Sequence, residues 1–198
     1  MSETPTRDAK LVQFLNEAYA KEKQLEISLQ AHADATPRED YAKRLKDHLK
    51  ETKSHATQVA RRIKQLGGNP ETVSVPGPDG LGKVAETVSE KLGKAKAAAH
   101  TPLQSMRRAG EQEKMLHNAR AEYADEAQEI ATYMVIDSLA TAAGDKETAK
   151  LARAIMREEE RMQSFLAGLL PELTAGVAHD EIPISELPET PAKIPTKA

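Results

Sequence analysis

Four stretches of this chain have the apolar periodicity of long helices, and acidic residues or histidines interrupt every one of these stripes. Residues three or four positions apart share one face of a helix. Burying an ionised carboxylate costs several kcal/mol unless a partner compensates its charge. The first two stripes are Leu11, Leu15, Ala18, Glu22, Leu25 and Leu29, and then Tyr41, Leu45, His48, Thr52, His55, Val59 and Leu66. Because the interruption recurs in all four stretches, we expect the helices to pack around a cation.

The composition agrees with a helical protein. Of the 198 residues, 30% are charged and only 3% are aromatic, a balance that favours helix over strand. The net charge of −3 is too small to suggest a nucleic-acid binder. Because the chain has no cysteine, disulfides, iron–sulfur clusters and thiolate zinc sites are excluded. Any bound metal must therefore be held by oxygen and nitrogen.

The sequence shows no targeting or membrane-spanning segment. The N-terminal stretch MSETPTRDAK lacks the apolar core of a secretory signal peptide. No run approaches the roughly 18 consecutive apolar residues of a membrane helix. We therefore expect a cytoplasmic protein without stable membrane insertion.

Proline and glycine divide the chain into long helices and a connection. Pro37 suits a helix start, Gly67 and Gly144 suit helix ends, and Pro171 is expected to stop the last helix. The helices are predicted over residues 6–33, 37–66, 81–100, 111–143 and 145–169. The proline-rich residues 179–198 have no apolar periodicity and are predicted to be a disordered tail.

The order of these helices predicts an all-α, ferritin-like four-helix bundle over residues 1–178. Its long crossover would carry one or two short helices, and a single crossover is typical of ferritin-like folds. Between residues 80 and 110 the crossover has six Lys/Arg against two acids. This pattern is found in basic helices that bind a membrane surface or an acidic partner. We favour a helix that packs on the bundle with its lysines in water, because its apolar side lacks anchoring aromatics.

The first two long helices offer a glutamate and a glutamate–histidine pair. Glu22 lies in the middle of its stripe, so we expect it to bind metal and not to reach water. Glu51 and His55 are four residues apart, close to the Glu-x-x-His spacing of di-metal bundles. We expect His55 to be a ligand and His48 to orient a carboxylate from outside the ligand set.

The third long helix offers three glutamates along one face. Glu126 and Glu129 are the candidate ligands, and Tyr133 lies one turn beyond them, where it could support the site from outside the ligand set. For Glu122, a solvated position is the better interpretation.

The fourth long helix offers two adjacent glutamates. Either Glu158 or Glu159 can follow the apolar stripe, and the sequence leaves the choice open. Met162 occupies the position three residues after Glu159 where the di-metal pattern has histidine. A thioether is a poor ligand for hard divalent metals, so this substitution weakens the pattern.

Three motifs resemble a known family. They are YAKEKQL at residues 19–25, HLKETKSH at 48–55 and EIATY at 129–133. Together with the glutamates before Met162, they resemble the YciF/YciE-like ferritin-like stress proteins over about residues 11–66 and 111–170. The resemblance implies dimeric or larger assemblies of bundles, induction in stress responses, and a di-metal centre. The matching positions are Glu22, Glu51, His55, Glu129 and Glu159.

The chain departs from this family at two places. Ala127 replaces a histidine of the family's third helix, and Met162 lacks a nitrogen, so His55 remains as the expected imidazole ligand. The leading hypothesis is a non-haem di-iron protein, or a manganese protein, that holds two ions per chain and reacts with oxygen or peroxide. Whether it is an oxidase or peroxidase stays open, as does binding of a single metal.

The alternative is a metal-free stress or interaction protein that acts through the basic crossover and the tail. The replacements at Ala127 and Met162 favour it. In either case a slim bundle with apolar residues outside its main stripes, such as Leu49 and Ile63, favours a homo-oligomer, most simply a dimer.

Overall fold

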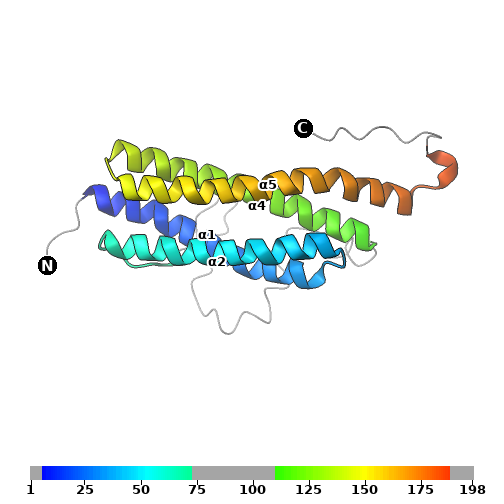
Figure 1. Cartoon of the computed structure of the whole chain (residues 1–198), viewed down its shortest axis with the longest axis horizontal. Coiled ribbons are helices and arrows are strands. Elements are labelled where there is room, and N and C mark those ends of the chain that lie inside the picture. Colours follow the sequence, from blue (N-terminus) through cyan, green and yellow to red (C-terminus); the bar gives the residue numbers. More distant parts are fainter. Residues whose placement is uncertain (1–5, 73–109, 188–198) are drawn as a thin grey trace, which may run out of the picture. The chain divides into compact units, whose positions relative to one another are not determined.

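A computed structural model of the chain describes residues 6–72 and 110–187, and the described residues are almost entirely helical (Figure 1). The four long helices are α1 (Thr6–Ala35), α2 (Glu39–Gln65), α4 (Glu111–Ala142) and α5 (Lys146–Glu181), and the short 3-10 helix η2 (Ile184–Glu186) follows them. No strand occurs in these residues, which confirms the all-α prediction. The helix predicted over 81–100, the basic crossover and residues 188–198 lie outside the described residues.

The predicted glycine stops form the expected backbone turns. Gly67 has a φ of 81°, and its amide donates to the carbonyl of Lys64, while the amide of Gly68 donates to the carbonyl of Ile63. This pair of bonds is the Schellman motif, which requires the left-handed conformation that glycine adopts readily. At the other start, α2 begins two residues later than predicted, because Pro37 precedes the cap residue Arg38.

The predicted end of the last helix at residue 169 is wrong. Helix α5 continues through Pro171 to Glu181, so the first residues of the predicted tail are helical. Proline removes a backbone hydrogen bond and costs about 3 kcal/mol inside a helix. The apolar stripe nevertheless continues past it, since Leu169 and Leu173 are at most 4% exposed. Burial of such leucines offsets the lost hydrogen bond.

The described residues form two compact units, where the sequence predicts one domain over 1–178. The first unit comprises α1, α2 and residues 126–142 of α4 with 146–162 of α5. The second comprises residues 111–125 of α4 with 163–181 of α5. All candidate ligands of the sequence belong to the first unit.

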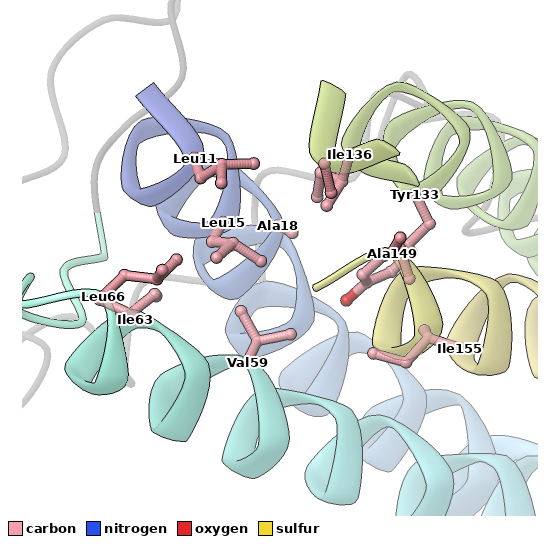
Figure 2. Packing of buried hydrophobic residues seen from close by; sticks show 12 residues of the cluster. Leu11, Leu15, Ala18, Val59, Ile63, Leu66, Tyr133, Ile136, Ala149 and Ile155 are labelled. Atoms are coloured by element: carbon pink, nitrogen blue, oxygen red, sulfur yellow. The ribbon is translucent and has the colours of Figure 1, made fainter. Parts of the chain in front are cut away.

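The core of the first unit is an apolar cluster contributed by all four helices (Figure 2). Leu11, Leu15 and Ala18 of α1 face Val59 and Ile63 of α2, because a short connection makes these two helices antiparallel neighbours. Residues of α4 and α5 complete the cluster: Tyr133, Ile136, Ala140, Ala149, Ala152 and Ile155.

An ion pair fixes α2 against the start of α5. Both carboxylate oxygens of Asp145 accept hydrogen bonds from Arg62, at 2.8 and 2.7 Å, and Asp145 also accepts the amide of Thr148 at 3.1 Å as a helix cap. One nitrogen of Arg62, Nη2, makes both contacts with Asp145, while its Nε donates to the hydroxyl of Thr148 at 2.7 Å, so the ion pair links α2 to the first turn of α5.

Among the described residues, none of the helices is both long and apolar enough to cross a membrane.

Candidate metal centre

Six ionisable side chains are buried together in the first unit. They come from all four helices and each is at most 2% exposed: Glu22, His48, His55, Glu126, Glu129 and Glu159. Their positions follow from the stripes, since a residue in line with buried leucines on a helix must face the same interior. Glutamates are almost never fully buried without partners.

The atoms that could bind a metal form two groups of three residues, and the groups share one carboxylate. One group is Glu22, His55 and Glu159, and the other is His48, Glu126 and Glu159. Within each group, one ligand atom per residue lies within 4.8 Å of the others. Glu159 is the residue that the two groups have in common.

In the first group, the Nδ1 atom of His55 faces two carboxylates. It lies 2.9 Å from Glu159 Oε1 and 3.5 Å from Glu22 Oε1. The hydroxyl of Tyr133, which is 1% exposed, donates a short hydrogen bond to the same oxygen of Glu22. Glu22 is therefore held in place by a residue that stands outside the group.

In the second group, the Nε2 atom of His48 takes the corresponding position. It lies 3.0 Å from Glu126 Oε1 and 3.4 Å from Glu159 Oε2. The two histidines thus approach the two oxygens of one shared carboxylate.

Two further glutamates contact the histidines from the other side. The Oε2 atom of Glu51 lies 3.0 Å from His48 Nδ1 and accepts a hydrogen bond from Arg44, also at 3.0 Å. The Oε2 atom of Glu158 lies 2.8 Å from His55 Nε2. Their side chains are 28% and 36% exposed. The structure brings neither glutamate into either metal group.

Several buried polar atoms of the cluster have no hydrogen-bond partner among the described residues. They are Glu22 Oε2, His55 Nδ1, Glu126 Oε2, Glu129 Oε2, Glu159 Oε1 and Glu159 Oε2. His55 Nδ1 and Glu159 Oε1 are close, but they lack the angle of a hydrogen bond. A buried polar atom without a partner costs about 1–3 kcal/mol. Carboxylate oxygen and imidazole nitrogen are ligands for iron, manganese and zinc, so these atoms fit metal ions.

Burial and mutual repulsion change the pKa values of the carboxyls. Burial raises the pKa of Glu129 well above its ordinary value, and repulsion by Glu22 and Glu159 adds to this. Burial likewise raises the pKa of Glu22, and raises that of Glu126 to about 8. For Glu159, burial acts in the same direction, but the contacts with His55, His48 and Glu126 together outweigh it, and the pKa is lowered.

The pKa values of the two histidines are raised, so that both rings favour the charged form. Burial lowers the pKa of His48, but its contacts with Glu126 and Glu51 outweigh burial and raise the pKa to about 9. In the same way, the contacts of His55 with Glu159 and Glu22 raise its pKa to about 11. Without a metal, the cluster therefore holds protons in place of other positive charge. Cations can take the place of these protons, as expected of a metal centre.

The structure brings together most residues that the sequence singles out. Glu22, His55, Glu126, Glu129 and Glu159 lie in one cluster, and of the adjacent glutamates it is Glu159 that faces inward. The ligand assignment itself stays a prediction. The expectation for Glu122 is wrong: it is only 3% exposed, although it belongs to the second unit.

The sequence analysis did not predict that His48 belongs to a candidate metal group. It is expected to orient a carboxylate, whereas the structure also places its Nε2 atom in the second metal group. The available signal was the seven-residue separation of His48 and His55, which is two turns of one stripe. Ala127, where the sequence resemblance implies a lost histidine, is exposed, so a side chain at that position would not face this cluster.

Known structures share the fold. A protein from Xanthomonas campestris superposes with a TM-score of 0.65 at 22% identity, over 89% of this chain and 99% of that one. The Desulfovibrio desulfuricans bacterioferritin, described with a diiron site, gives 0.61 at 20% identity over 88% and 86%. The Escherichia coli stress protein YciF gives 0.59 at 20% identity over 86% and 98%. These similarities confirm the ferritin-like fold.

No curated protein matches the chain in sequence. Residues 6–178 match the family described as a domain of unknown function, DUF892. With YciF among the similar structures, the resemblance to the YciF-like proteins is confirmed. The chain is therefore a member of the DUF892 family, with a ferritin-like fold.

Proposed function

We propose that this protein binds two divalent metal ions, iron or manganese, in a carboxylate-rich centre between its four helices. The observation that carries the proposal is the pair of buried ligand groups that share Glu159. Charge supports the number of ions, because four buried glutamates offer four negative charges, enough to balance two divalent cations. The four are Glu22, Glu126, Glu129 and Glu159.

Each side chain has a separate role in binding. Glu22 and His55 would hold one ion, and His48 and Glu126 would hold the other. Glu159 would contact both, and Glu129 would supply the remaining negative charge next to them. Oxygen and imidazole donors without thiolate suit iron and manganese.

The ions, when bound, would supply the electrons that reduce dioxygen or a peroxide. The protein would bind the ions and shield them from bulk water. The six side chains of the cluster are at most 2% exposed, so bulk water is excluded. Burial and the neighbouring Glu22 raise the pKa of Tyr133 well above its ordinary value, so its hydroxyl keeps a proton to donate to Glu22. The stress-response setting is suggested by the similar stress protein YciF.

Metal content tests the proposal. The protein would be loaded anaerobically with ferrous iron, desalted, and analysed for iron, and its consumption of peroxide would then be followed. We expect about two irons per chain, near-complete loss in Glu159→Ala, and partial loss in Glu22→Ala. Asp47→Asn is the matched control, because Asp47 is a partly exposed carboxylate of α2 that pairs with Lys43 and Lys50 at the surface.

Absence of bound iron and manganese in the wild-type protein would reject the proposal. It would favour the metal-free alternative, which depends on the basic crossover and on the tail, of which residues 188–198 lie outside the described residues. Retention of two ions in Glu159→Ala would reject the shared-carboxylate arrangement.

A homodimer remains part of the proposal. Three large apolar side chains of the first unit, Ile27, Met134 and Val135, are 48–55% exposed, which leaves apolar surface for a second copy to cover. Sedimentation equilibrium of the full chain would measure the oligomeric state.

A further inference from the structure

Each buried histidine lies between an inner and an outer carboxylate. His48 has Glu126 on its inner side at 3.0 Å and Glu51 on its outer side at 3.0 Å. His55 has Glu159 on its inner side at 2.9 Å and Glu158 on its outer side at 2.8 Å. Both imidazole rings are at most 1% exposed, so the outer glutamates take the place that water would otherwise occupy.

The two rings have opposite orientations. His48 turns Nε2 toward the cluster and Nδ1 toward Glu51. His55 turns Nδ1 toward the cluster and Nε2 toward Glu158. The difference has a local origin, because Glu51 follows His48 by three residues on the same helix, whereas Glu158 reaches His55 from another helix.

We propose that Glu51 and Glu158 are positioning residues, which fix the two histidines in opposite ring orientations so that His48 binds metal through Nε2 and His55 through Nδ1. This inference rests on the proposed metal-binding function. It gives both glutamates a role outside the ligand set.

The chemistry of imidazole supports this role. A neutral imidazole that binds a metal through one nitrogen carries its hydrogen on the other, and that N–H needs an acceptor. In a buried ring, loss of the acceptor leaves an unsatisfied donor. Arg44 donates to the same oxygen of Glu51 at 3.0 Å and so holds this acceptor in place.

The adjacent glutamates of α5 act as a pair on one ring. Neighbouring helix residues point about 100° apart, so two adjacent side chains cannot occupy the same position. Glu159 Oε1 lies 2.9 Å from Nδ1 of His55, and Glu158 Oε2 lies 2.8 Å from its Nε2. Each glutamate of the pair contacts one nitrogen of His55. This explains why two successive glutamates occur here, where the helical stripe needs only one.

Zinc is the probe that tests this inference, because it is diamagnetic and accepts the same donors. The full chain with ¹⁵N-labelled histidine would be loaded with Zn²⁺, and long-range ¹H–¹⁵N spectra would report the metal-bound nitrogen of each ring. We expect one metal-bound ring protonated at Nδ1 and one protonated at Nε2.

Variants of the outer glutamates give the second readout. Glu51→Leu and Glu158→Leu remove the acceptor, and each should weaken zinc binding about 10–100-fold and disturb the spectrum of its own histidine. Glu51→Gln and Glu158→Gln keep a carbonyl acceptor and should restore most of the affinity and the ring orientation. Asp47→Asn should leave both unchanged. Both glutamates are partly exposed, so circular dichroism should show intact helices in every variant.

The outcomes separate this inference from the proposed function. Zinc binding with both rings attached through the same nitrogen, or unchanged affinity in both leucine variants, would overturn the positioning role and leave the metal centre in place. Equal losses in the leucine and glutamine variants would show that only charge matters, which also overturns it. Failure of the wild-type protein to bind zinc or iron would overturn both.

Discussion

Two layers of the first unit are built by the same four helices but are opposite in chemistry. In the apolar cluster around Leu15, Ile63 and Ile136, the side chains are hydrophobic, and only the hydroxyl of Tyr133 reaches out of it, to Glu22. In the adjoining candidate metal centre, the same helices carry carboxylates and imidazoles, and six of their polar atoms have no hydrogen-bond partner among residues 6–72 and 110–187. The comparison shows that helix geometry decides which residues meet, while side-chain chemistry decides whether their meeting stabilises the fold.

The two layers should therefore respond in opposite ways to the loss of a side chain. The apolar layer supplies the hydrophobic free energy of the unit. The buried carboxylates and imidazoles of the candidate metal centre lower the stability of the unit as long as no cation balances their charge. Measurements on the metal-free protein and on the loaded protein separate these contributions.

The largest effect on stability is expected in the apolar layer. Leu15 is 1% exposed, and Leu15→Ala would leave a cavity among the helices. We expect the free energy of unfolding to fall by about 2–5 kcal/mol, with metal content unchanged. Chemical denaturation and metal analysis measure the two quantities. Loss of bound metal at unchanged stability would show that the layers are not separate.

Of the two layers, only the candidate metal centre should change its contribution to stability between pH 5 and pH 9. In the folded protein the pKa of His48 is raised to about 9 and that of Glu126 to about 8. Groups whose pKa is raised on folding stabilise the protein fully below their unfolded pKa and lose this effect as the pH rises through the folded pKa. We expect Tm of the metal-free protein to fall by about 5 °C or more between pH 5 and pH 9.

Thermal melts of metal-free wild-type protein and of Leu15→Ala across this pH range provide the check. Because Leu15 does not titrate and the pKa of Tyr133 is raised well above its ordinary value, both proteins should show the same fall. A Tm that stays level, or rises, over the range would contradict the arrangement of charges described here.

A smaller effect of opposite sign is expected from Glu129→Gln. Glu129 is 2% exposed, and burial with repulsion from its neighbours raises its pKa well above the ordinary value. A neutral amide removes that cost, so the metal-free protein should gain about 1–2 kcal/mol at pH 8. The gain should shrink at pH 4, where the carboxyl is also protonated in the unfolded chain. Denaturant titrations at both pH values test this, and a loss of stability at pH 8 would contradict it.

The periodicity of the sequence predicted the long helices and most of the buried ionisable residues. Glu22 interrupts an apolar stripe, and His55 and Glu126 lie in line with other buried residues of their helices, so each shares a buried environment. The helix ends at Gly67 and Gly144 were also predicted from the sequence, because a left-handed turn favours glycine. The end of α5 was missed, since local propensity weighs Pro171 as a stop while burial of Leu173 extends the helix.

By itself, the sequence determined that four amphipathic helices would bury carboxylates and histidines together, because this follows from periodicity within each helix. Only the tertiary structure decided which of Glu158 and Glu159 faces inward, which nitrogen each histidine presents, and that His48 joins the centre. These choices depend on the rotation and register of one helix against another, at distances of a few ångströms. Side-chain packing between helices sets that register, and no pattern within a single helix encodes it.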